Sequence, residues 1–364
     1  MTEREQQILS ILRDEPLIAQ QALADRLGIS RPAVAGHIMN LMQKGHILGK
    51  GYVLADQRFV LVLGGANMDI SATTERRLTA ADSNPGRIRS APGGVARNVA
   101  ENLARLGHDT RLLSAVGDDL QGRSLLEATQ KAGVDVRGCW VFTGEATSTY
   151  VSLHGPAGDL EVAVNDMRIL ERITPEQLAT QVERVRHAAA LVVDCNVTDA
   201  ALAWLFANRG ATPVFVDAVS AFKCLRIRPW LGQVHTLKVN RQEAQTLCGF
   251  TLQTDADIER AAQCLHNLGV QQLVLSLGAR GLYWSDRDGG HGWHGVVPGD
   301  VVNVTGAGDA LMAGLVHGFV HHQTLAESIP FALACAALTV ASEQANHPSL
   351  SVVTVAQLLR TTTE

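Results

Sequence analysis

The sequence contains no long uninterrupted run of hydrophobic residues. Its longest apolar stretch, roughly residues 331–341, is broken by Thr339 and falls well short of the ~20 residues that a membrane-spanning helix needs. The opening residues 1–5 also lack the hydrophobic segment of a secretory signal. We therefore expect a soluble protein of the cytoplasm, with no membrane contact.

Cysteine is scarce and scattered. The six cysteines include no C-x-x-C pair, which argues against both a disulfide framework and a cysteine-based zinc site. We interpret them as small buried hydrophobic residues that stay reduced. His317 and His321 have the four-residue spacing of a zinc-binding pair, but no H-E-x-x-H motif and no nearby third ligand accompany them. We interpret these two histidines as surface or packing residues.

Two common nucleotide-binding motifs are missing. The sequence has no G-x-x-x-x-G-K-[ST] stretch, which excludes an ordinary P-loop. Residues 290–295 fit G-x-G-x-x-G, but no helix follows them, so we interpret them as a hairpin loop and not as a dinucleotide site.

An excess of positive charge is also absent. The 31 Lys and Arg residues stand against 36 Asp and Glu, a formal net charge of −5, which excludes a protein that chiefly binds polyanions without specificity. Hydrophobic residues make up 46% and charged residues 18%, enough apolar material for a sizeable core. At about 150 residues per domain, the length of the chain predicts two or three domains.

Residues 1–56 have a pattern of their own. Apolar residues recur at helical spacing in two short segments, the second ended by Gly28, and Ser30 with Pro32 then marks the start of a third helix. Residues 46–54 are typical of a small hairpin. Three helices followed by such a wing resemble a winged helix-turn-helix.

The third helix of this segment is a candidate for contact with DNA. The pattern predicts a buried stripe of Val34, Ile38, Leu41 and Met42 and an exposed set of Arg31, His37, Asn40 and Lys44. Because residues 1–56 hold six basic and six acidic residues, duplex binding would depend on a few placed cations and on dimerisation. A role as a dimer handle or partner contact stays open.

The remaining residues, 57–364, alternate between strands and helices. Apolar runs at 59–63, 191–193, 214–216 and 273–275 are typical of strands buried on both faces. The alternation predicts a mostly parallel sheet covered by helices. Residues 147–164 instead predict a hairpin, which we interpret as a lid or a dimer flap.

Residues 303–314 carry the densest chemical motif. Small residues at 306–308 leave backbone N–H groups uncovered, and a helix is expected to begin at Asp309. A helix N-terminus stabilises an anion, while the carboxylate there can take a proton from an attacking hydroxyl. The combination suits phosphoryl transfer. A plain glycine-rich turn before a helix is the alternative.

A second glycine pair, in residues 92–100, opens another helix and is followed by Gly107 and Gly117. Together the two glycine motifs match both signatures of the PfkB/ribokinase family of carbohydrate and nucleoside kinases, which the chain resembles from about residue 58 to 364. Further family landmarks occur in order at 64–69, 240–243 and 276–281. The resemblance implies a three-layer α/β/α sandwich with a small β-lid, here 57–364, preceded by the winged helix-turn-helix of 1–56.

The resemblance implies roles for residues at matching positions. Asp309 is the expected catalytic base, with the amides of Gly306, Ala307 and Gly308 as the anion hole. The residues expected to line the acceptor pocket are Asn67, Asp69, Gly93, Gly94, Arg97, Asn98 and Thr149. Those expected at ATP are Asn240, Ser276, Gly278 and Gly281, with Glu243 ordering the waters of Mg²⁺.

Three departures from ribokinase itself affect these expectations. Val95 stands where ribokinase carries a lysine. Arg97, just before Asn98, pairs either with a polar base edge or phosphate or with a neighbouring surface carboxylate. Asn303 replaces the usual aspartate of a monovalent-cation site that would include Thr305, which puts K⁺ dependence in doubt.

The acceptor is expected to be the 5′-hydroxyl of a ribosyl nucleoside. Residues 93–98, 147–150 and 217–223 are most similar to the pseudouridine kinase branch of the family. Other nucleosides and free sugars such as ribose stay open, as does a transcription regulator whose kinase-like domain only senses a ligand. We expect a homodimer.

Overall fold

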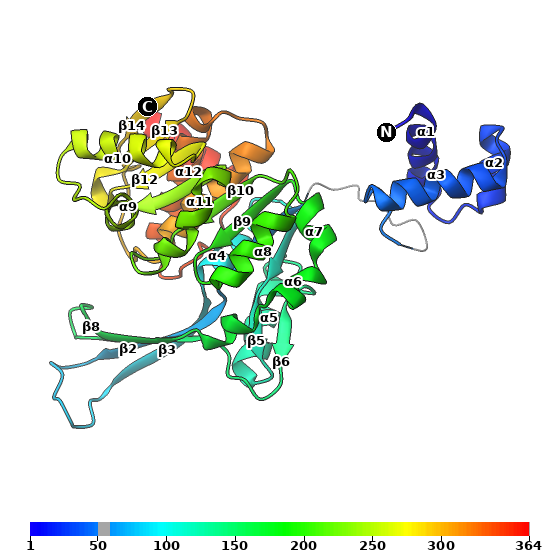
Figure 1. The fold of residues 1–364 in the computed structure, drawn as a ribbon. Helices are drawn as coiled ribbons and strands as arrows, with labels where there is room; N and C mark the ends of the chain where they lie inside the picture. Colours follow the sequence, from blue (N-terminus) through cyan, green and yellow to red (C-terminus); the bar gives the residue numbers. More distant parts are fainter. Residues whose placement is uncertain (50–58, 364) are drawn as a thin grey trace. The chain divides into compact units, whose positions relative to one another are not determined.

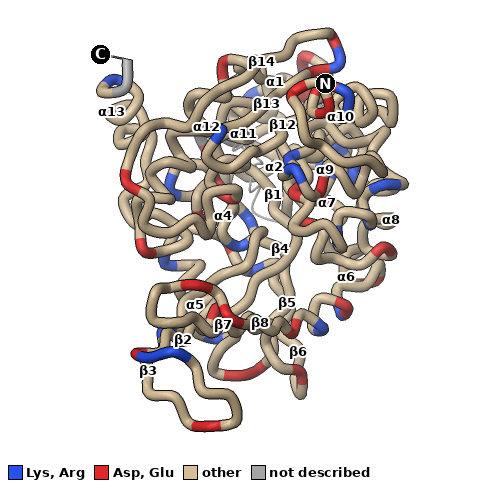
Figure 2. The backbone as a smooth tube through the Cα atoms, turned by 90° about the vertical axis from the view of Figure 1, so that its left-hand side faces the viewer, with Lys and Arg blue, Asp and Glu red and all other residues tan. Residues whose placement is uncertain are grey.

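The computed structural model describes residues 1–49 and 59–363, and the chain divides into two compact units, Met1–Arg58 and Phe59–Glu364. Each unit is described by itself. In the described residues no helix has the length and apolar character to cross a membrane. Positive and negative residues are interspersed along the backbone of the second unit (Figure 2).

The first unit contains the three expected helices, α1 (Glu3–Asp14), α2 (Gln20–Leu27) and α3 (Arg31–Gln43) (Figure 1). The Ser30 hydroxyl caps α3 by accepting from Ala33 N at 3.3 Å. The residues that form the buried core of this unit are Ile8, Leu9, Leu12, Leu23, Ala24, Val34, Ile38, Leu41 and Ile47. Met42, expected in the buried stripe, is 42% exposed, so that prediction is wrong. Residues 50–54 of the expected wing lie outside the described residues.

Lys44 at the end of α3 is tied to α1. Its ammonium donates to both carboxylate oxygens of Glu5 at 2.8 Å, and the Glu5 side chain is only 2% exposed. Lys44 is exposed as predicted, and its ion pair also anchors α3 to α1. Arg31 and Asn40 are exposed as predicted, and His37 is half-buried.

The second unit is built on one large sheet of strand order β14-β13-β12-β11-β10-β9-β1-β4. The pairs from β4 to β12 are parallel, and β13 and β14 add an antiparallel edge. The bounds are β1 (Val60–Leu63), β4 (Thr110–Leu113), β9 (Ala190–Asp194), β10 (Val214–Asp217), β11 (Thr236–Asn240), β12 (Gln272–Ser276), β13 (Leu282–Asp286) and β14 (His291–His294). Residues 290–295 belong to the β13–β14 hairpin, but 291–294 form its second strand and not the expected loop, which lies at 287–290.

Helices cover both faces of this sheet, which confirms three layers. Leu61 and Leu63 of β1 pack into one core, whereas Val60 and Val62 pack into the other. The first core is covered by α6 (Pro175–Ala179), α7 (Val182–His187), α8 (Asp199–Asn208), α9 (Arg241–Cys248) and α10 (Asp255–Asn267). The second is covered by α4 (Val95–Arg105), α5 (Leu120–Lys131), α11 (Ala307–Val320), α12 (Leu325–Val340) and α13 (Val352–Thr363). Short elements complete the unit: β5 (Ala115–Gly117), β6 (Trp140–Phe142), η1 (Arg168–Arg172), η2 (Lys223–Gln233) and η3 (Gly278–Arg280).

A second, four-stranded sheet extends away from the body of this unit (Figure 1). Its order is β3-β2-β7-β8, with bounds β2 (Asn67–Thr74), β3 (Gly86–Gly93), β7 (Thr149–His154) and β8 (Leu160–Asp166). The hairpin expected at 147–164 is confirmed as β7 and β8. Strands β2 and β3 were not predicted from the sequence, so the lid has four strands in place of the expected two.

Candidate active site

Asp309 lies in the first turn of α11, directly after a turn that requires glycine. Gly306 has a φ of 82°, and a Cβ there would come within 1.9 Å of the Ala345 carbonyl oxygen. The helix begins at Ala307, two residues earlier than expected. Gly306 has no side chain to cover the first amides, which carry the positive end of the helix dipole. The Asp309 carboxylate is 8% exposed beside them.

Asn98 holds the Asp309 carboxylate from the neighbouring helix. Its Nδ2 donates to Asp309 Oδ2 at 2.8 Å, and Asn98 lies in the first turn of α4. Because α4 and α11 both begin at the same end of the main sheet, two glycine motifs about 200 residues apart in the sequence form one site. This is the contact that the sequence could suggest only through the family resemblance.

Lys238 is a buried lysine behind this turn, and its ammonium interacts with the carboxylates of Asp217 and Asp309. Lys238 Nζ donates to Asp217 Oδ2 at 2.7 Å, and a Cβ at position 308 would come within 2.6 Å of the same Nζ. Lys238 and Asp217 are 9% and 2% exposed. A cation is therefore held directly beside the backbone of residue 308, where it adds to the positive potential of the helix N-terminus.

These charges act on Asp309. Burial and the nearby Asp217 carboxylate raise the pKa of the Asp309 carboxyl, whereas the Lys238 ammonium and the Asn98 hydrogen bond lower it, and the net result is a pKa of about 7. An acid with a pKa near neutrality is suited to accept a proton at physiological pH.

Asp194 at the end of β9 organises the backbone around the first glycine pair. Its Oδ2 accepts from Gly65 N at 2.8 Å and from Ala96 N at 3.0 Å. The carboxylate thus caps α4 in place of Gly94, which precedes the helix. Asp194 is 1% exposed, so it supports the loop from within.

Asn67 and Asp69 lie together at the start of β2. Asn67 Nδ2 donates to Asp69 Oδ1 at 2.5 Å. A Cβ at Gly93 on the paired strand would come within 2.1 Å of Asp69 Oδ2, so glycine makes room for this carboxylate. Burial raises the pKa of Asp69, and the Asn67 hydrogen bond and the Arg97 charge lower it.

Arg97 faces the protein interior. It forms a buried ion pair with Glu101, and its Nη1 donates to Asn98 Oδ1 at 3.0 Å and to Asn346 Oδ1 at 2.9 Å. The sequence left open whether Arg97 pairs with a base edge or phosphate or with a surface carboxylate. In the structure it pairs with a carboxylate, and this carboxylate is buried. Because the Asn98 carbonyl accepts from Arg97, the Asn98 amide NH₂ is turned toward Asp309.

The register of the lid sheet separates two faces. Asp69 is opposite Tyr150, and Tyr150 is opposite Asn165, so these three residues form a row across one face. Thr149, which the sequence analysis expected in the pocket, pairs with Met68 on the other face, and its hydroxyl donates to Thr147 O at 3.1 Å. The structure therefore does not bring Thr149 together with Asp69.

A cleft of about 660 Å³ lies at the end of β8, where it is lined by Asn165 of this row and also by Val164 and Asp166, which alternate to the other face. Lys223 Nζ donates to Asn196 Oδ1 at 2.6 Å on its inner wall, and Asn196 is also the nearest side chain to Gly65. Its other lining residues come from the end of β8, from η1, from the loop after β9 and from η2: Val164, Asn165, Asp166, Met167, Arg168, Glu171, Thr198, Asp199 and Arg226.

The residues expected at the nucleotide lie at the carboxyl ends of β11 and β12. Asn240 and Glu243 form a reciprocal cap at the start of α9, with Asn240 N donating to Glu243 Oε2 at 2.8 Å and Glu243 N donating to Asn240 Oδ1 at 2.9 Å. Ser276 is opposite Asn240 in the register. Gly278 and Gly281 bound the short turn that follows, both with positive φ.

Asn303 and Thr305 form a small turn before α11. Thr305 N donates to Asn303 Oδ1 at 2.9 Å, and Asn303 Nδ2 donates to Glu343 O at 3.0 Å. The Asn303 side chain thus joins the glycine motif to the loop after α12.

Several of these positions escaped the sequence analysis. Asp194, Asp217 and Lys238 are charged residues at the ends of buried strands or inside them, and a lysine between Leu237 and Val239 is an available signal for a buried charge. Tyr150 and Asn165 carried no such signal, because only the lid register brings them into line with Asp69.

Comparisons with known proteins agree with this arrangement. Residues 57–351 match the pfkB family carbohydrate kinase model, and residues 1–47 match a winged helix-turn-helix DNA-binding model. A pseudouridine kinase of Escherichia coli (strain K12) is 45% identical over 84% of this chain and 98% of its own length. An uncharacterized sugar kinase of the same strain is 44% identical over 96% of this chain and 97% of its own length.

Solved structures share the fold of the second unit. A carbohydrate kinase from Agrobacterium tumefaciens has a TM-score of 0.73 at 29% identity over 83% of this chain and 97% of its own. Ribokinase from Arabidopsis thaliana, at 24% identity, has a TM-score of 0.75 over 84% of this chain and 99% of its own. The chain belongs to the pfkB family of carbohydrate kinases, as an ATP-dependent sugar or nucleoside kinase with an N-terminal winged helix-turn-helix.

Proposed function

We propose that Asp309 is the general base of this kinase and that the acceptor is a nucleoside, with pseudouridine as the favoured substrate. The observation that carries the first part is the Asp309 carboxylate itself. It is buried at a helix N-terminus, held by Asn98, and has a pKa of about 7. In phosphoryl transfer such a carboxylate takes the proton of the attacking hydroxyl as the bond to phosphorus forms.

The amides of Gly306, Ala307 and Gly308 form the anion hole in this proposal. The transferred phosphoryl group carries negative charge on its equatorial oxygens, and N–H groups at a helix N-terminus stabilise that charge. The Lys238 ammonium beside residue 308 supports this role from behind. Its ion pair with Asp217 keeps it in place.

The nucleotide end of the site consists of Asn240, Ser276, Gly278 and Gly281. Mg²⁺ prefers oxygen ligands and keeps several of its waters. Glu243 fits a role in holding such waters, because its carboxylate is 3% exposed and fixed by Asn240. When bound, the ion supplies positive charge beside the phosphates. Asn303 and Thr305 are the proposed residues near a monovalent cation, K⁺, and the carboxylate missing at 303 argues for weak dependence.

The acceptor's ribose would bind through its vicinal hydroxyls to Asp69 and Asn67, with the 5′-hydroxyl toward Asp309. A carboxylate can accept two such hydroxyl donors at once. Gly93, Gly94 and Asn98 would complete this pocket. Beyond it, Asn165 lies in the same row as Asp69 and lines the 660 Å³ cleft together with Lys223. This cleft offers room and polar partners for a base.

Pseudouridine differs from uridine by one additional ring N–H. The Asn165 amide, which is exposed in the structure, can accept from that donor, and once a bound base covers this amide, leaving it unpaired would cost about 1–3 kcal/mol. Identity of 45% to the Escherichia coli pseudouridine kinase supports this acceptor. Because identity to the uncharacterized sugar kinase is 44%, a sugar is also a candidate acceptor.

The test is ATP consumption with a panel of pseudouridine, uridine, inosine and ribose. We expect kcat/KM for pseudouridine to exceed that for uridine and for ribose by at least about tenfold, which corresponds to about 1.4 kcal/mol. Asn165→Ala should reduce this preference, whereas Asn208→Ala on α8 serves as a matched control outside the cleft. Equal or better use of ribose or inosine would overturn the pseudouridine assignment and leave the kinase assignment in place.

We propose that the first unit binds DNA through α3. Arg31 and Asn40 are its exposed polar residues, and residues 1–47 match a winged helix-turn-helix DNA-binding model. With Lys44 paired to Glu5, few free cations remain on α3. Affinity should therefore depend on a dimer, in which two recognition helices contact adjacent half-sites.

One face of the lid sheet is a candidate interface for the proposed homodimer. The lid face opposite Asp69 carries four exposed apolar residues: Ile88 (76%), Val151 (43%), Val162 (52%) and Val164 (66%). Val151 is opposite Val164, and Leu153 is opposite Val162, so the apolar residues are contiguous. An exposed apolar sheet face of this kind is typical of an interface, and a second copy offers the same face in return.

A further inference from the structure

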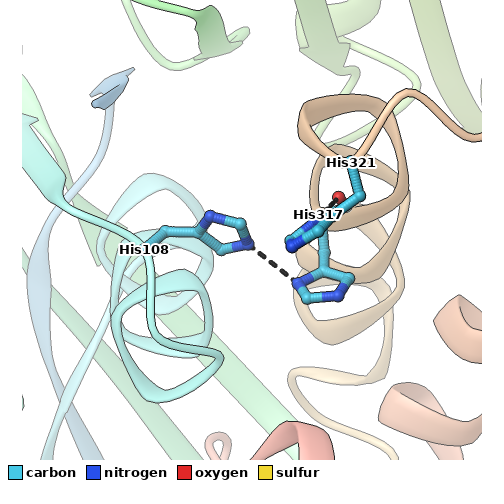
Figure 3. A group of neighbouring side chains, drawn as sticks. All are labelled: His108, His317 and His321. Atoms are coloured by element: carbon cyan, nitrogen blue, oxygen red, sulfur yellow. Dashed lines mark hydrogen bonds between the residues drawn. The ribbon is translucent and has the colours of Figure 1, made fainter. Parts of the chain in front are cut away.

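Three histidines meet in the second unit, two helical turns along α11 from Asp309. His317 lies in the last turn of α11, His321 is the residue directly after that helix, and His108 lies in the loop between α4 and β4 (Figure 3). Candidate ligand atoms of all three lie within 4.8 Å of one another. The sequence has the i, i+4 pair but no third ligand near it. The fold supplies that ligand from 209 residues away.

The rings are held so that nitrogen atoms converge. His108 Nε2 and His317 Nδ1 are 2.8 Å apart. His321 Nδ1 lies 2.8 Å from the His317 carbonyl oxygen, which can only accept, so this nitrogen carries the proton and Nε2 keeps its lone pair. Phe331 stacks on the His317 ring at 4.5 Å between centroids and 10° between planes, which fixes that ring.

The charge state of the cluster suits a cation. Imidazole binds a metal through the lone pair of a neutral ring. The short contact between His108 Nε2 and His317 Nδ1 requires one of these two nitrogen atoms to accept, so at least one of the two rings is neutral. His321 is exposed, so an ion can enter from solvent, and a water can complete its coordination.

We propose that His108, His317 and His321 bind one Zn²⁺ ion per chain. Imidazole nitrogen atoms select zinc and similar transition metals over Mg²⁺ and Ca²⁺. Tetrahedral zinc with bonds of about 2.0–2.1 Å places its nitrogen ligands roughly 3.3 Å apart, so the 2.8 Å pair has to open by about half an ångström. The proton shared between those two rings moves to the outer nitrogen of the ring that donates it.

Such an ion would tie two helices together at a second point. The first turns of α4 and α11 are joined by the hydrogen bond from Asn98 to Asp309. The histidine cluster joins the far end of α11 to the residues that follow α4. Zinc that binds only the folded protein raises its thermal stability in proportion to the logarithm of zinc concentration above Kd. The ion would thus stabilise the pair of helices that carries the proposed base.

The test uses full-length protein without a histidine tag, stripped with EDTA and dialysed. ZnCl₂ is titrated in buffer containing millimolar Mg²⁺, with calorimetry for stoichiometry and thermal unfolding for stability. We expect one tight site per chain and a rise of several degrees in Tm. His321→Ala, which removes the exposed ligand, should weaken binding by at least about tenfold and abolish the rise. His322→Asn, at the adjacent residue, should behave as wild type.

Cobalt provides an independent readout on the unaltered chain. Co²⁺ in this site should show the visible absorption of tetrahedral nitrogen coordination, without thiolate charge-transfer bands. Thiolate bands, no zinc binding by the wild type, or equal affinity in wild type and the His321→Ala variant would each overturn the proposal. Circular dichroism of the His321→Ala variant checks its fold, and if that variant unfolds, the wild-type cobalt spectrum decides.

Discussion

The Asp309 carboxyl combines burial with charged neighbours of opposite sign. Burial and Asp217 raise its pKa, while Lys238 and the Asn98 hydrogen bond lower it, with a result of about 7. A base works only when deprotonated, so activity should fall as the pH drops through this value.

The pH profile of kcat/KM tests this balance. We expect an acid limb near pH 7, with activity at pH 6 about tenfold below its plateau. Asp217→Asn removes a like charge and should move the limb to lower pH, whereas Lys238→Met removes the opposite charge and should move it higher. Asp255→Asn, in an exposed ion pair with Arg280, should leave the limb in place. If neither Asp217→Asn nor Lys238→Met moved the acid limb, this result would contradict Asp309 as the titrating group.

Single residues differ in how far the sequence could predict them. Asp309 and Asn98 were predicted from the family resemblance, since each follows a glycine motif, and the structure brings their side chains together. Lys238 was missed because its meaning depends on β10 and β11 being neighbours, which places it against Asp217. Thr149 lies on the face opposite Asp69 because one step along a strand reverses the face of the sheet.

The elements of the main sheet were predictable for a physical reason. Strands such as β1 and β9 are buried on both faces and therefore appear as continuous apolar runs. The lid strands β2 and β3 have one polar face and carry Arg87, Arg89 and Pro92, so no apolar run marks them. The pairing of β2 with β7 is a contact between segments some 80 residues apart, and no local pattern encodes it.

The apolar face of the lid leads to a prediction about assembly. Val162→Lys combined with Val164→Lys places two charges on that face and should weaken the dimer by at least about 100-fold, because each buried valine contributes about 1.5 kcal/mol or more. Ala163→Lys, between them in β8 and opposite Ser152, changes the opposite face and serves as the control. Light scattering after size exclusion should show a monomer for the double variant and a dimer for the control. A wild-type monomer, or a double variant that stays dimeric, would exclude this face as the interface.

At the scale of the whole molecule, the chain joins a kinase to a helix-turn-helix. The matched pseudouridine kinase covers 84% of this chain, whereas the matched sugar kinase covers 96%. The second match has to include most of the first unit, because the second unit alone has 306 residues. Each unit also has its own hydrophobic core.

This organisation predicts that the kinase works alone. A chain that begins at Gln57 should fold and keep kcat within about twofold, since none of the proposed site residues precedes it. Any DNA binding should be lost, and in the full chain it should weaken steeply with salt. Steady-state kinetics, gel shift and circular dichroism of both chains check this. A folded but inactive short chain would mean that the first unit completes the active site.

The most direct test of the mechanism is the turnover of the Asp309→Asn variant with ATP and pseudouridine. Asparagine keeps the shape of the side chain and can still contact the hydroxyl, but it cannot accept the proton. We predict that kcat falls by at least about 100-fold while KM changes little, with the fold confirmed by circular dichroism. Near wild-type kcat in this variant would contradict the assignment of Asp309 as the base.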